Sequence, residues 1–185
     1  AVLAGQIDIR GLGAITAMGI SDDGRTVAIG VSNGQTGSLF VANPGIQPRL
    51  AASLQHPVAI AFLHNSSDAI VADDSQNAIY YVSAGQVYGV ASAADGVAAP
   101  VAVAVSNDNQ RVFAANSQSR SVMTIALSGE AAAPVYCNCA LTGMYPTSTD
   151  SVFRLTDFTG SPILLFDANR ATPRITYVPV SGSQF

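Results

Sequence analysis

Residues 100–127 alternate bulky and small apolar positions in a way that predicts three short β-strands. Valine alternates with alanine over 101–105, which is the period of a strand with one bulky face and one small face. Pro100 cannot donate a ladder hydrogen bond and therefore suits the start of a strand. Turn-forming residues at 106–109 and 116–119 separate this strand from two further extended segments.

The same pattern occurs at two earlier places in the chain. Residues 57–62 match 100–105 at a displacement of 43 residues, and residues 15–20 match again about one period earlier. Each match is followed by turn residues and by two more β-branched or aromatic segments. A period of about 40 to 45 residues that carries several strands is typical of the blades of a propeller.

The third copy also carries a recognisable motif. The pattern P-x-A-x-A-x-S-x-D-x-x-R-V-F-A-A-N over 100–116 resembles the YVTN/NHL-type β-propeller repeat, with a second good match at 21–25. The resemblance covers nearly the whole chain and implies an all-β propeller. Such repeats occur in binding proteins, surface proteins and a few enzymes, so the resemblance implies a fold and not a reaction.

We expect a single propeller domain built from four repeats of four antiparallel strands. The repeats are predicted at 13–55, 56–98, 99–141 and 142–181, with an extra strand at 2–9 within 1–12. Their outermost strands are predicted at 48–53, 86–91, 135–140 and 174–180. No helix is predicted, because Gly96 and Pro100 interrupt the alanine-rich segment 91–99.

The fourth repeat admits two registers. In one, residues 144–149 form a short inner strand and 151–156 the second strand. In the other, residues 152–156 form the inner strand, and 1–10 supply the missing outer strand. A propeller must close or leave strand edges open to pairing, and four blades is the lower limit for a ring. The chain is therefore a four-bladed ring, a part of a larger ring, or one half of a homodimer that completes a ring.

The amino-acid composition limits the classes of binding partner that we expect. Only 11% of the residues are charged, against about 25% in ordinary globular domains. The net charge is −4, and a sequence this acidic argues against a nucleic-acid partner, which usually requires a basic patch. No apolar run is long enough to span a membrane. Residues 1–10 lack the charged start and long apolar centre of a signal peptide, which is compatible with a signal that has been removed. We therefore expect a secreted or extracytoplasmic location.

Polar residues follow the second strand of successive repeats. Asp73, Asp74, Asn116 and either Thr156 or Asp157 hold this place, and Gly30 holds it in the first repeat. Equivalent positions of a ring gather at one mouth of the central channel, where oxygen ligands could bind calcium. The competing explanation is that Asp and Asn simply make the turn after each strand. The residues of this mouth are the candidate metal site.

Cysteine and histidine offer little further chemistry. On a strand, Cys137 and Cys139 would face the same side, as a metal or redox pair, as two small buried residues, or as a local disulfide. A zinc site needs four ligands, and only His56 and His64 could add to this pair. His64 is expected in a solvated turn, and His56 at a junction between blades. No catalytic triad or nucleophile elbow is visible.

The leading hypothesis is a non-enzymatic β-propeller that binds a protein or a small-molecule ligand. A lactonase-like or other hydrolytic propeller is the alternative, since some relatives of this repeat type are enzymes. It would require acids and bases at the channel mouth, and only the region of Asp73 and Asp74 offers them. A structural fragment whose partner surface lies elsewhere is a third option. A channel lined by Ala, Ser and Val would favour a scaffold.

Overall fold

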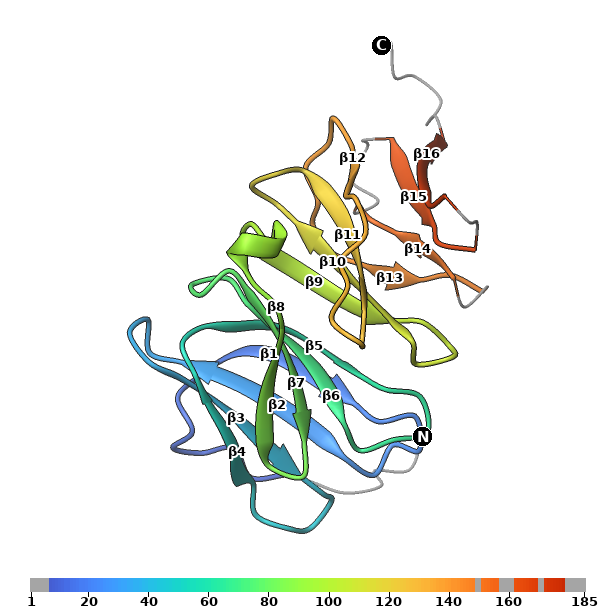
Figure 1. Cartoon of the computed structure of the whole chain (residues 1–185). Helices are drawn as coiled ribbons and strands as arrows, with labels where there is room; N and C mark the ends of the chain where they lie inside the picture. The colour runs from blue at the N-terminus through green and yellow to red at the C-terminus, as the bar shows by residue number, and fades with distance from the viewer. Residues whose placement is uncertain (1–6, 149–150, 157–161, 170–171, 179–185) are drawn as a thin grey trace.

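The computed structural model describes residues 7–148, 151–156, 162–169 and 172–178, and it arranges them in four antiparallel sheets of four strands (Figure 1). We call these sheets blades 1 to 4. Blade 1 contains β1 (Ala14–Ile20), β2 (Val27–Ser32), β3 (Gly37–Ala42) and β4 (Arg49–Leu54). Blade 2 contains β5 (Pro57–Phe62), β6 (Ala69–Asp73), β7 (Ala78–Ser83) and β8 (Gln86–Ala91). Blade 3 contains β9 (Pro100–Val105), β10 (Arg111–Asn116), β11 (Ser121–Ala126) and β12 (Val135–Tyr136). Blade 4 contains β13 (Tyr145–Pro146), β14 (Val152–Arg154), β15 (Ile163–Asp167) and β16 (Arg174–Val178).

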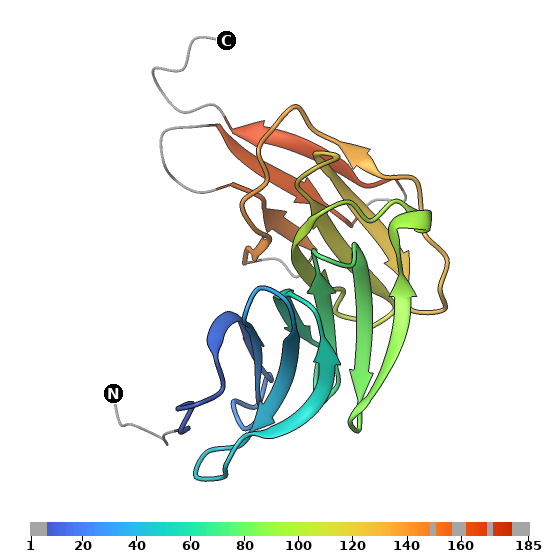
Figure 2. The same cartoon turned by 90° about the vertical axis from the view of Figure 1, so that its left-hand side faces the viewer.

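The blades follow one another along an arc in chain order, with blade 1 at one end and blade 4 at the other (Figure 2). Within each blade the strands are also in chain order. Residues of β1, β5 and β9 line one central cavity together with residues 142–145, which identifies the first strand of each blade as its inner strand. The predicted all-β propeller architecture is confirmed.

Apolar residues fill the contact zones between successive blades, which we call seams 1/2, 2/3 and 3/4. Seam 1/2 contains Leu39 and Val71, and seam 2/3 contains Val112 and Met123. Seam 3/4 is built around three phenylalanines, Phe113, Phe153 and Phe166, whose ring centroids lie 5.5 to 6.5 Å apart. The alternation of the strands explains this arrangement, because each strand presents one set of side chains to the preceding blade and the other set to the following blade.

Each predicted repeat contains the four strands of one sheet. In the fourth repeat, β13 pairs with β14 and β14 with β15, so the register with a short inner strand at 144–149 is correct and the rival register is wrong. The outer strand of that blade is β16, and residues 179–180 lie outside the described part of the chain. Of the extra strand predicted at 2–9, residues 1–6 also lie outside it, and residues 7–9 are not in a strand.

Two local differences from the sequence-based expectation have physical reasons. The outer strand predicted at 135–140 ends after Tyr136, because the next residues close a tight loop between Cys137 and Cys139. The segment predicted without helix contains a single 3-10 turn at Ala93–Asp95, which ends at Gly96 with a φ of 100°. No helix in the described part of the chain is long and apolar enough to cross a membrane.

Candidate functional site

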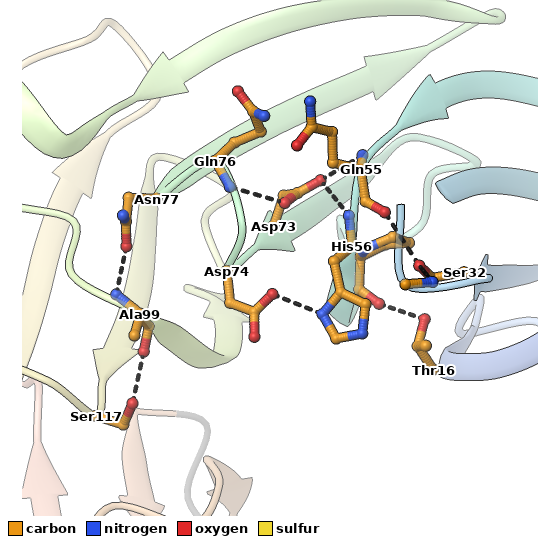
Figure 3. Close-up of polar contacts among 12 residues, drawn as sticks. Thr16, Ser32, Gln55, His56, Asp73, Asp74, Gln76, Asn77, Ala99 and Ser117 are labelled. Atoms are coloured by element: carbon orange, nitrogen blue, oxygen red, sulfur yellow. Dashed lines mark hydrogen bonds and ion pairs between the residues drawn. The ribbon is translucent and has the colours of Figure 1, made fainter. Parts of the chain in front are cut away.

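Asp73 is the polar centre of seam 1/2. It lies at the end of β6 and is fully buried. Its Oδ2 accepts hydrogen bonds from the backbone N–H groups of Gln55 (2.8 Å) and His56 (2.9 Å), and its Oδ1 accepts one from Gln76 (3.0 Å) (Figure 3). The carboxylate thus fastens the linker between blades 1 and 2 to the second strand of blade 2 and to its turn. Its oxygens are used by the backbone, as the turn explanation expects.

His56 and Asp74 form a second contact on the same linker. The Nδ1 atom of His56 lies 2.6 Å from the Oδ1 atom of Asp74, and about a third of each side chain is exposed to solvent (Figure 3). A carboxylate on one ring nitrogen fixes the orientation of an imidazole. The contact leaves Nε2 as the nitrogen through which the ring could exchange a proton with a bound molecule.

The equivalent positions at seam 2/3 carry no such pair. Asn116 is fully buried, and its side chain accepts from the N–H of Ala98 (3.2 Å) and donates to the carbonyl of Gly96 (3.4 Å). The pairing of Pro57 with Asp73 and of Pro100 with Asn116 makes Ala99 the equivalent of His56, and Ser117 the equivalent of Asp74. Among these two seams, a histidine beside a carboxylate therefore occurs only at seam 1/2.

The residues predicted to gather at one channel mouth lie in three successive blades. Asp73 and Asp74 belong to seam 1/2 and Asn116 to seam 2/3. Thr156 is buried in blade 4, where its hydroxyl donates to the carbonyl of Pro162 (3.2 Å), and Asp157 lies outside the described residues. The described residues contain no group of three or more His, Cys, Asp or Glu side chains placed to bind a metal ion.

Gly30 is not the counterpart of Asp73 and Asn116 in blade 1. The strand pairing puts Val31 at that position, because the β2–β3 hairpin has one additional residue pair at its end, Ser32 with Gly37. Gly30 itself lies against the next blade, where an added Cβ would come within 3.1 Å of Pro57. The polar role at the end of β2 is taken by Ser32, whose hydroxyl contacts the linker carbonyl of Gln55 (3.2 Å).

Calcium binding at this mouth stays a prediction. Asp73 and Asn116 bond to backbone groups, so a calcium ion would have to compete with the seams for their oxygens. The test is the melting temperature with calcium and with a chelator. A higher melting temperature in the presence of calcium would support the site, and equal melting temperatures with calcium and with chelator would speak against it.

The central cavity has a volume of about 220 Å³ and is lined mainly by residues with aliphatic side chains. It is formed by residues 17–18, 58–60, 101–103 and 142–145, which are mostly Ala, Val, Ile and Met. No lining residue in the described part of the chain is charged. This lining corresponds to the scaffold-like channel of the two alternatives that the sequence left open.

The second histidine lies on the turns at the opposite ends of the inner strands. His64 Nδ1 lies 3.1 Å from Asp22 Oδ2, and the N–H of Asn65 donates to the same carboxylate oxygen (3.0 Å). Asn109 bonds to both backbone groups of His64, at 2.8 and 3.0 Å. The β1–β2, β5–β6 and β9–β10 turns of neighbouring blades are therefore linked to one another, and His64 acts within this chain of contacts.

Cys137 and Cys139 form a disulfide, with their Cα atoms 5.3 Å apart. The two residues follow β12 and do not lie on a strand, and the backbone N–H of Cys137 still bonds to the carbonyl of Arg120 (2.9 Å). Of the interpretations that the sequence left open, the local disulfide is the one observed. In this form the sulfurs are not thiolates and do not serve as metal ligands.

The contact between His56 and Asp74 was not predicted from the sequence. His56 was expected at a blade junction and Asp74 at the channel mouth, with no contact between them. The signal was nevertheless present, since an Asp-Asp pair ends a buried strand and the histidine directly precedes Pro57 at the start of the inner strand. Only the fold shows that the linker returns past the end of β6.

No protein-family model matches the chain, and no curated protein sequence matches it. Solved structures do resemble it. Hydrazine synthase from Kuenenia stuttgartiensis has a TM-score of 0.67 at 14% identity, over 96% of this chain and 53% of that one. A catalytically inactive histidine-to-alanine variant of virginiamycin B lyase from Staphylococcus aureus, with quinupristin, has a TM-score of 0.70 at 13% identity, over 95% and 58%.

The structure of a nidogen/laminin complex also matches, with a TM-score of 0.70 at 14% identity, over 89% of this chain and 65% of that one. The chain thus spans between about half and two thirds of the length of these neighbours. Such likenesses support the β-propeller fold alone, and membership of the YVTN/NHL repeat family stays a prediction.

Proposed function

We propose that this propeller is a non-enzymatic interaction or ligand-binding module that contacts an apolar group at the inner side of its arc. The observation that supports the proposal is the uncharged lining of the central cavity, described above. A concave apolar surface with few polar groups is the usual form of a ligand site. The nidogen/laminin neighbour, a complex between proteins, shows that this fold is used for protein binding in at least one case.

Methionine methyl signals offer a direct test. The chain contains three methionines. Met18 and Met144 line the cavity, whereas Met123 is fully buried in seam 2/3 and does not line it. We expect small apolar probe compounds and hydrophobic peptides to shift the methyl signal of Met144 while that of Met123 stays in place. Val101→Arg, which puts a charge in the cavity, should abolish the shift. A Met144 signal that no probe moves would contradict the proposal.

A second candidate function follows from the contact between His56 and Asp74. A histidine oriented by a carboxylate can act as a general acid or base, and the pair is partly exposed. The lyase neighbour is a catalytically inactive variant in which alanine replaces a histidine. We propose ester or lactone cleavage as the reaction class for this alternative.

The chain provides a matched control for the enzymatic alternative. His56→Ala should abolish turnover of a panel of lactones, whereas His64→Ala should retain it, because His64 also contacts an aspartate but belongs to the turns at the other end of the inner strands. If the natural chain turns over a lactone and the His56→Ala variant does so at the same rate, a catalytic role of His56 is ruled out.

We further propose a secreted or extracytoplasmic location. Disulfides persist mainly in oxidising compartments, and the bond between Cys137 and Cys139 supports the proposal. Alkylation of the protein taken from its native cells, followed by mass spectrometry, tests it. Two alkylated cysteines would indicate a reducing compartment.

A further inference from the structure

Blade 1 has an apolar outer face that no described residue covers fully. Met18 is 66% exposed, Ile20 62% and Leu50 56%. Strand pairing places Met18 beside Ile29, Ile29 beside Phe40, and Phe40 beside Leu50, so that these side chains form one row across all four strands. Ile29 within this row is only 1% exposed, so the exposed apolar surface is formed by Met18, Ile20 and Leu50 around it. An exposed apolar surface of this kind indicates an interaction site.

The row faces away from blade 2. Gly19, between Met18 and Ile20, faces blade 2 so closely that an added Cβ would lie 2.9 Å from Ile60. Since successive residues of a strand point to opposite faces, Met18 and Ile20 point away from seam 1/2. The exposed face is therefore the side of blade 1 on which a preceding blade would pack.

The repeat itself shows what these positions do elsewhere. Ile20, Phe62 and Val105 each end an inner strand, paired with the first residue of the second strand. Phe62 and Val105 are buried against the preceding blade, with 8% and 6% exposure, and Val103, the counterpart of Met18, is 7% exposed. The position of Ile20 is thus buried at seams 1/2 and 2/3. The position of Met18 is buried at seam 2/3 and half-buried at seam 1/2, where it is occupied by Ile60, and both positions are exposed in blade 1.

The repeat also shows which residues the preceding blade presents at a seam. Seam 2/3 places Val103 and Val105 with Ala59 and Ala61 of the preceding inner strand, and seam 1/2 places Ile60 against Gly19. Small residues on the preceding blade leave room for the bulky ones that follow. A surface that covers Met18 and Ile20 should therefore present alanine or glycine at two alternate positions of a strand.

We propose that the outer face of blade 1 binds a further four-stranded blade of the same repeat type, with Ala or Gly at the two contact positions of its innermost strand. The face continues the pattern of seams 1/2 and 2/3, which are already formed. The solved neighbours agree with this, since the chain accounts for only 53% to 65% of their length. The inference is independent of whether the propeller binds or catalyses.

Blade 4 of a second copy does not present this chemistry. At the position of Ala104, blade 4 has Tyr145, whose ring lies over Gly143 so closely that an added Cβ there would be 2.6 Å from it. The guanidinium of Arg154 lies over the Tyr145 ring, 4.2 Å from its centroid. The small-residue positions that would receive Met18 and Ile20 are therefore filled by an aromatic ring.

The test adds the proposed blade to the intact chain. A second copy of residues 56–98, which carries Ala59 and Ala61, is fused ahead of Ala1, so that residues 1–13 form a linker of sufficient reach. The readout is oxidation of each methionine by dilute peroxide, followed by peptide mass spectrometry. In the natural chain we expect Met18 to react first, because Met123 is fully buried and Met144 is 8% exposed. In the fusion, oxidation of Met18 should slow roughly tenfold, since the sulfur must be accessible to the oxidant.

The matched control is the same fusion with Ala59→Arg and Ala61→Arg in the added copy only, in which Met18 should react as in the natural chain. Protection of Met123 shows in every sample that the fold is intact. Equal reactivity of Met18 in the natural chain and the fusion would overturn the proposal. If instead the oxidation of Met18 in the natural chain slows as the protein concentration rises, and light scattering then gives the mass of a dimer, self-association through this face would replace the proposed binding of a further blade.

Discussion

The polar residues at the ends of the second strands hold the linkers in place. Asp73 and Asn116 are buried, and each bonds to backbone groups of the segment that leads into an inner strand. The sequence predicted the positions and offered two explanations, a metal site and a turn. The hydrogen bonds favour the structural explanation, because a buried backbone N–H without a partner is costly.

Asp73→Ala should lower the free energy of unfolding by about 3 kcal/mol, since it leaves three backbone N–H groups without their acceptor. Asp74→Ala, at a partly exposed neighbouring position, should cost about 1 kcal/mol or less. Urea denaturation of both variants compares the two effects. Similar losses for the two variants would contradict the structural role of Asp73.

Two turn carboxylates should make the protein sensitive to acid. The hydroxyl of Ser106 lowers the pKa of Asp108, and the hydroxyl of Ser21 lowers the pKa of Asp23, each with help from a backbone N–H group. Because the folded pKa lies below the unfolded value of about 3.9, this stabilisation is complete above that value and is lost as the pH falls through the folded pKa.

The expected result is a urea midpoint that decreases between about pH 4 and pH 2. The double variant Asp23→Asn and Asp108→Asn should show a smaller decrease over the same range. Asp95→Asn, at a carboxylate in the 3-10 turn, serves as the control. Parallel curves for the natural chain and the double variant would refute the assignment.

Individual strands were predictable where a bulky and a small face alternate, and were not predictable where a covalent bond intervenes. The inner strands β5 and β9 start at the prolines that mark them, and β8 has the predicted bounds. By contrast, β12 contains only Val135 and Tyr136, because a disulfide loop replaces the expected pairing. The assignment of Gly30 to the position of Asp73 was wrong for another reason. The β2–β3 hairpin has an extra residue pair, which does not change the pattern of apolar and polar residues.

The disulfide of blade 3 should contribute modestly to stability. Replacing both Cys137 and Cys139 by serine should lower the free energy of unfolding by about 1.5 kcal/mol, because a very short loop restricts the unfolded chain less than a long one. Thermal unfolding of the variant, compared with the natural chain in reducing and oxidising buffer, measures the effect. A double variant as stable as the oxidised natural chain would refute it.

At the scale of the molecule, each blade packs mainly on its neighbours in the chain. The buried apolar residues that the structure describes form three clusters, one per seam, and those of blade 4 all belong to seam 3/4. Repeat architecture could be predicted from the sequence, because the period recurs. The exposure of Met18 and Ile20 could not, since burial depends on a neighbour that the repeat pattern does not specify.

Blade 4 should therefore separate from the others when its seam is weakened. Phe166 is fully buried between Phe113 and Phe153, so Phe166→Ala should cost about 3 to 5 kcal/mol. Hydrogen exchange should accelerate in β14 and β15 while β6 and β10 retain their protection. Uniform acceleration across all four blades would show that the arc unfolds as one unit.

The hydrogen bonds between the linkers and the ends of the second strands also affect how the number of blades in such a chain can change. Asp73 belongs to blade 2 and holds the segment that enters blade 2, as Asn116 does for blade 3. Each blade thus contains the residue that holds its own entering linker, and the preceding blade need only present a complementary surface. A duplication or deletion of about 43 residues would carry this residue along with its blade, so gene-level gain and loss of whole units would leave the remaining joints intact.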